Sequence, residues 1–149
     1  MMLATIQQLR EISQCCLNGG KLDSDQARWL GDSLDKFLSH RARTIEDAMG
    51  LRAVRGGVPW WLEEAIRKRD HALRAAAEKH FPNCPVSAQA TALRSIALRY
   101  AASTWRFDRQ NDAMPSAYAG TLMECVWRAF KSGAPMPIST RQLRNILAR

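Results

Sequence analysis

The spacing of apolar residues restricts the fold of this chain more than any other feature of its sequence. Apolar side chains recur at intervals of three and four residues, as Ile6, Leu9 and Ile12 do near the start. This is the period of an α-helix that buries one face, and the alternation of a half-buried strand is nowhere sustained. With 149 residues, 46% of them hydrophobic, the chain has the size and apolar content of one domain. We therefore expect a single all-α domain over residues 1–149, folded as a compact helical bundle.

Signals for helix ends divide this chain into about six to seven helices. Gly19 and Gly50 follow periodic runs, as glycine commonly does after a helix. Ser24 and Thr44 can cap the helices that follow them, and Pro59 suits the first turn of a long helix. The expected helices cover residues 3–17, 24–40, 44–49, 59–81, 87–110, 121–131 and 139–149.

The helix expected over residues 87–110 has two different faces. Its inner face is predicted to carry Leu93, Ile96, Ala97, Tyr100, Thr104 and Phe107. Its outer face is predicted to carry a stripe of arginines, namely Arg94, Arg99, Arg106 and Arg109.

The arginine stripe has no acidic partner on its own helix before the final turn. No Asp or Glu occurs between Glu78 and Asp108, so carboxylates at i−4 and i+4 are missing. The preceding helix differs, because there the sequence predicts ion pairs that join Glu63 to Arg67, Glu64 to Lys68 and Asp70 to Arg74. An arginine stripe without partners suits phosphate binding. The alternatives are a solvated surface or pairing with the acidic residues of the second helix, Asp25, Asp32 and Asp35.

The last two expected helices resemble a helix-turn-helix in outline. On the final helix Leu143, Ile146 and Leu147 face inward, which leaves Arg141, Arg144 and Asn145 on the outer face. Such side chains can contact base edges or phosphates. The connection Ser-Gly-Ala-Pro-Met-Pro is longer than the usual turn of three or four residues. A plain helical hairpin is the alternative interpretation.

A basic connector precedes the long helix that begins at Pro59. Arg52 and Arg55 lie there with Gly56 and Gly57, next to Trp60. Arginines, flexible glycines and a helix N-terminus can bind an anion, and an exposed indole can stack on a base. The alternative is a flexible joint whose tryptophans pack against the helix.

Three tryptophans are candidates for a protein contact. Trp29 lies opposite the apolar stripe of its helix, which is formed by Ala27, Leu30, Leu34, Phe37 and Leu38. Trp127 belongs to a helix that is apolar around most of its circumference. Together with Trp60, these residues form a predicted interaction set, and burial in the core is the alternative.

The charge distribution favours a polyanionic partner. The chain carries a net charge of +8, and residues 51–149 have sixteen basic and seven acidic residues. There is no signal-peptide pattern and no apolar run long enough to cross a membrane, so we expect a cytoplasmic protein with reduced cysteines. The sequence also lacks a full set of metal ligands at suitable spacing and any recognisable arrangement of catalytic residues. We therefore expect no metal, cofactor or catalysis.

These observations lead to one preferred function and one alternative. The preferred hypothesis is a nucleic-acid-binding accessory or regulatory protein, DNA-binding in the first place, that uses its arginine-rich helical face. The alternative is a protein interaction module or a small homo-oligomer that binds an acidic protein partner through its aromatic surfaces and arginines.

Overall fold

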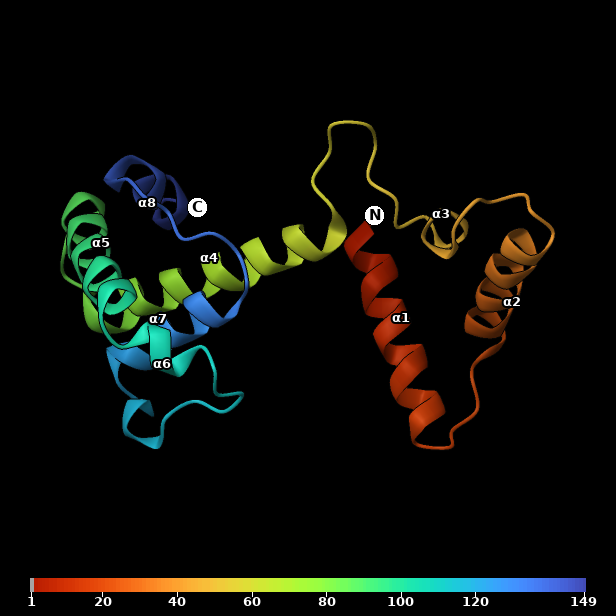
Figure 1. Cartoon of the computed structure of the whole chain (residues 1–149), viewed down its shortest axis with the longest axis horizontal. Coiled ribbons are helices and arrows are strands. Elements are labelled where there is room, and N and C mark those ends of the chain that lie inside the picture. The colour runs from red at the N-terminus through yellow and green to blue at the C-terminus, as the bar shows by residue number, and fades with distance from the viewer. Residues whose placement is uncertain (1) are drawn as a thin grey trace. The chain divides into compact units, whose positions relative to one another are not determined.

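The computed structural model describes residues 2–149, and the regular secondary structure in that range is helical throughout (Figure 1). The all-α prediction is therefore confirmed. None of these helices has the length and apolar character needed to cross a membrane. The elements are α1 (Met2–Leu17), α2 (Ser24–Leu38), α3 (Ile45–Met49), α4 (Trp60–His80), α5 (Val86–Ala102), α6 (Trp105–Asp108), the 3₁₀ helix η1 (Ser116–Tyr118), α7 (Leu122–Lys131) and α8 (Thr140–Leu147).

The chain divides into two compact units. The N-terminal unit ends at Trp61, and the C-terminal unit covers Leu62–Arg149. Each has its own buried residues, and each is described by itself below. The single domain expected over residues 1–149 stays a prediction.

Short polar caps start the helices of the N-terminal unit. Asp23 caps α2, because its Oδ1 accepts a hydrogen bond from the amide of Gln26 at 2.8 Å. The cap expected at Ser24 is therefore one residue too late, since Ser24 already belongs to the helix. Thr44 caps α3 as predicted, and its Oγ1 accepts from the amide of Asp47 at 3.1 Å. Gly50 then ends α3 with a φ of 73°, a conformation that glycine adopts without strain.

The N-terminal unit has a small core and an exposed apolar face. Ile6, Ile12, Ala48 and Leu51 are its buried hydrophobic residues. On α2 the predicted buried stripe is wrong for Leu34, Phe37 and Leu38, all of which are exposed. The side of α2 that packs against α3 meets a helix of only five residues. A partner that short does not cover a face four turns long.

Four helices of the C-terminal unit share a close-packed core. One cluster joins Ala72 and Leu73 of α4 to Ala90 of α5, Ala129 of α7 and Leu143 of α8. A second joins α4, α5 and α7 through Ala76, Ala77, Leu93 and Cys125. Small alanines and two leucines, Leu73 and Leu143, form the first cluster, and Leu93 is the leucine of the second. Figure 1 shows the four helices that supply them.

The helix expected over residues 87–110 is interrupted after Ala102. Ser103 ends α5 with φ −118° and ψ −82°, and its Oγ donates a hydrogen bond to the carbonyl of Arg99 at 2.7 Å. A serine that bonds back to the preceding turn competes with regular helix geometry. The chain restarts as α6, so the predicted inner face is wrong at its end: Thr104 is exposed, and 59% of Phe107 is exposed.

Helix α7 begins without a side-chain cap. Thr121 makes no cap hydrogen bond, because its Oγ1 donates to the carbonyl of Tyr118 at 2.7 Å. Glu124 accepts from the amide of Gly120 at 2.6 Å and from Arg128. The bond from Gly120 is the main reason that the pKa of Glu124 lies below its usual value.

We expect Leu143→Ala to destabilise the C-terminal unit strongly. Leu143 is only 2% exposed and joins α8 to α4, α5 and α7, so the substitution leaves a cavity and should cost about 2–5 kcal/mol. Urea unfolding followed by circular dichroism measures the change. Leu98→Ala is the matched control, because Leu98 is 51% exposed on α5. Equal losses in the two variants would contradict the proposed core.

Candidate nucleic-acid interface

Helix α8 presents a polar outer face because its inner face is anchored. Its start is a capping box in which Ser139 Oγ accepts from the amide of Gln142 at 3.2 Å and Gln142 Oε1 accepts from the amide of Ser139 at 3.4 Å. Leu143 then enters the core. At 100° per residue, Arg141, Arg144 and Asn145 lie on the opposite side, and all three are exposed.

Helix α8 packs against α5, and Arg94 of α5 contacts the backbone just before α8. Arg94 Nε donates a hydrogen bond to the carbonyl of Ile138 at 3.2 Å, just before α8 begins. Arg94 is exposed and belongs to the middle of α5. The sequence predicted Arg94 and Arg141 as parts of two separate candidates, and the packing of α8 on α5 places both beside the start of α8.

We name Arg94, Arg141, Arg144 and Asn145 the α5–α8 basic face. Neither α5 nor α8 contains an Asp or Glu, and the chain has no acidic side chain after Glu124. Within residues 2–149, no carboxylate lies within ion-pair distance of Arg94, Arg141 or Arg144. The positive charge of this surface is therefore not neutralised locally.

Two arginines of α4 donate hydrogen bonds to backbone carbonyls of α8 and of the segment that precedes it. Arg74 Nε donates to the carbonyl of Ile146 at 3.0 Å, and Arg69 Nη1 donates to the carbonyl of Pro135 at 2.5 Å. Arg69 also pairs with Asp70 at 2.7 Å. The predicted pair of Asp70 with Arg74 is wrong, because both residues have these other partners. A pair between Glu64 and Lys68 is present at 3.8 Å, as predicted.

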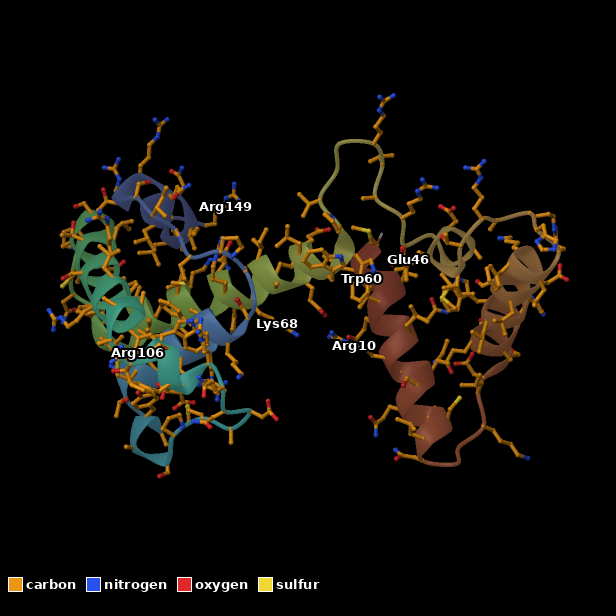
Figure 2. The ribbon with its side chains drawn as sticks, viewed as in Figure 1. Arg10, Glu46, Trp60, Lys68, Arg106 and Arg149 are labelled. Atoms are coloured by element: carbon orange, nitrogen blue, oxygen red, sulfur yellow. The ribbon has the colours of Figure 1, made fainter. Side chains whose placement is uncertain are left out.

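Of the other arginines of the predicted stripe, Arg99 shares α5 with Arg94, whereas Arg106 and Arg109 do not. Arg106 and Arg109 follow the break after Ala102, so the single continuous stripe is wrong. Arg106 lies on α6 (Figure 2). Its guanidinium is 4.6 Å from the ring centroid of Phe107. The backbone carbonyl of Arg109 accepts from Lys131 Nζ at 3.3 Å. Arg99 is exposed at the carboxyl-terminal end of α5, beside a cavity described below.

The basic connector lies in the N-terminal unit, and its two arginines differ in their surroundings. Arg52 Nη1 donates to both carboxylate oxygens of Asp47, at 3.1 Å and 3.0 Å. Its charge is therefore neutralised. Arg55 is exposed in the turn before Gly56, whose φ is 81°. Anion binding by this connector stays a prediction, with Arg55 as its only exposed arginine outside an ion pair in the described chain.

The C-terminal hairpin differs from a helix-turn-helix in two respects. Eight residues, 132–139, separate α7 from α8. The most extensive helix contact of α8 is with α5, not with the helix that precedes it. The helix-turn-helix interpretation stays a prediction.

The tryptophans predicted for protein contact are half-buried. Trp29, Trp60 and Trp127 all fall in this class. The indole nitrogens of Trp60 and Trp127 are buried without an acceptor among the described residues. Trp60 lines a hollow of the N-terminal unit together with Arg10 (Figure 2). The neighbouring Trp61 is more open to solvent, with 57% of its surface exposed.

A buried carboxylate forms a second polar centre in the C-terminal unit. Asp108 Oδ2 accepts hydrogen bonds from the hydroxyls of Tyr100 and Tyr118, at 2.7 Å and 2.8 Å. Burial, then the bond to Asp108 and its charge, raise the pKa of both tyrosines above the ordinary value of 10.0. The rings of Trp105 and Phe130 pack against Tyr100, at centroid distances of 5.9 Å and 5.0 Å. Helical periodicity gave no signal for this centre, which depends on the break after α5.

These tyrosines should make the stability of the C-terminal unit fall at high pH. Their pKa is raised in the folded state. Their contribution to the free energy of unfolding is therefore complete below about pH 10 and is lost as the pH rises beyond it. Urea unfolding between about pH 8 and pH 11 measures the decline. Tyr118→Phe should show a shallower decline, because one of the two phenols is removed. An unchanged slope in that variant would contradict the assignment.

The comparisons with known proteins found no relative of this chain. It matches no protein-family model, no curated protein and no solved structure.

Proposed function

We propose that the C-terminal unit binds nucleic acid, duplex DNA in the first place, through the α5–α8 basic face. One observation carries the proposal: two helices that pack on each other bring exposed arginines together and contain no acidic residue. A polyanion is the partner that neutralises such a surface at several points at once. No catalytic step is part of this function.

The side chains suit different parts of the contact. Arg141 and Arg144 have planar guanidinium groups with several donors, which match phosphate oxygens. Asn145 has both a donor and an acceptor on the same exposed face, a combination that can contact a base edge. The C-terminal unit carries fourteen basic and seven acidic residues, and this excess attracts a polyanion over a longer range.

We expect the full chain to bind a fluorescein-labelled duplex of random sequence with an affinity that falls steeply as salt rises. Three phosphate contacts predict a slope of about −3 for the logarithm of affinity against the logarithm of salt concentration. The triple variant Arg94→Gln, Arg141→Gln, Arg144→Gln should bind at least about tenfold more weakly and with a shallower slope. Fluorescence anisotropy measures both quantities.

A matched triple variant controls for the loss of net charge. Lys21→Gln, Arg28→Gln, Arg43→Gln removes the same three charges from exposed positions of the N-terminal unit. It should retain most of the affinity. Equal losses in the two triple variants would mean that net charge alone drives binding. No binding of DNA or RNA even at low salt would reject the proposal.

A second candidate function, self-association, is favoured by the apolar face of α2. Leu34, Phe37 and Leu38 are exposed at helical spacing, and Leu38 is 72% exposed. A contiguous apolar surface of this kind is typical of a contact between proteins. It agrees with the alternative of a small homo-oligomer.

This candidate predicts a mass that depends on concentration. Light scattering coupled to size exclusion should show a dimer at high concentration, and Phe37→Glu with Leu38→Glu should weaken the dimer at least about tenfold. Leu17→Glu is the control, because Leu17 is exposed on α1 rather than α2. A monomer at every concentration would exclude self-association.

A further inference from the structure

The C-terminal unit contains a cavity that the proposed DNA contact does not use. Its volume is about 470 Å³, and it lies between the carboxyl-terminal end of α5, η1 and the start of α7. Ile96, Tyr100, Tyr118, Leu122 and Met123 supply most of its apolar wall. Arg99 lines it as well, and Arg99 lies outside the α5–α8 basic face. Small-molecule sites are commonly concave, largely apolar and of this size.

The wall of the cavity is held in place by the buried carboxylate of Asp108. Both tyrosine hydroxyls bond to Asp108 Oδ2, so neither ring turns without breaking a hydrogen bond. Tyr100 is only 3% exposed and packs edge-on against Phe130, with interplanar angle 89°. A site with a wall that is fixed before binding loses little entropy when a ligand enters.

The polar groups of the cavity select the charge of a ligand. The hydroxyls of Ser103 and Thr121 donate to the carbonyls of Arg99 and Tyr118, both at 2.7 Å, so their protons are already used. The guanidinium of Arg99 has no ion-pair partner in the described chain. Thr104 also lines the cavity with a hydroxyl, but Arg99 is the charged residue among those that line it. Its guanidinium therefore favours an anion at the edge of an otherwise apolar surface.

We propose that this cavity binds an aromatic carboxylate, with the carboxylate on Arg99 and the ring system against Ile96, Leu122 and Met123. A volume of about 470 Å³ accommodates a body of two fused rings. Flat rings also suit a wall that includes two tyrosines. The ligand joins α5, η1 and α7, so it stabilises the folded C-terminal unit by mass action.

The test uses naphthalene-2-carboxylate as the probe and the full chain labelled with nitrogen-15. Titration should shift the amide resonances of Ile96, Leu122 and Met123 to saturation. Naphthalene-2-carboxamide, which has the same shape without the charge, should bind about tenfold more weakly, since it lacks the charge-assisted hydrogen bond to Arg99.

The variants identify the residue that selects the charge. Arg99→Gln should weaken carboxylate binding to the level of the carboxamide and leave carboxamide binding unchanged. Arg109→Gln, which removes an exposed arginine of the same unit outside the cavity, should change neither. Dispersed amide resonances confirm that each variant is folded. The proposal is overturned by a lack of saturable shifts at millimolar carboxylate, or by an Arg99→Gln variant that still prefers the carboxylate.

Discussion

The packing of α8 against α5, and its contact with α4 through Leu143, determine most of what the C-terminal unit offers to a partner. Alanines at the contacts let the helices approach, and Leu143 fills the space that remains. Arg69 and Arg74 then bond to backbone carbonyls on either side of this contact, which fixes the rotation of α8. The outer face of α8 therefore has one orientation, and Arg94 lies beside the start of the helix.

A second constraint acts at the other end of α5. Helix α5 ends before Ser103, and the chain then turns so that Asp108 accepts hydrogen bonds from Tyr100 and Tyr118. Burying a carboxylate costs free energy unless it is hydrogen-bonded, and the two hydroxyls both bond to its Oδ2. The same bonds hold the tyrosines that line the cavity beside Arg99. Helix α5 thus contributes Arg94 to the α5–α8 basic face and Arg99 to the largely apolar cavity.

The N-terminal unit has a smaller core than the C-terminal unit. Its buried hydrophobic residues are few, and its helices keep Leu34, Phe37 and Leu38 of α2 exposed. Helical periodicity identifies an apolar face but does not state what covers it, because the covering element is often distant in sequence. The connector before α4 is another case in which the sequence pattern does not reveal the partner. All its charged residues are basic, but the charge of Arg52 is neutralised by its ion pair with Asp47.

The sequence by itself determined the helical class, most helix ends and the outer face of α8, because periodicity and caps act over a few residues. It also located the long interval without acidic residues. Only the tertiary structure decided that α5 ends at Ala102, that Asp70 pairs with Arg69, and that Arg94 meets α8. These features depend on groups far apart in the chain. Burial and hydrogen bonding in the folded unit select them, and no local pattern encodes that selection.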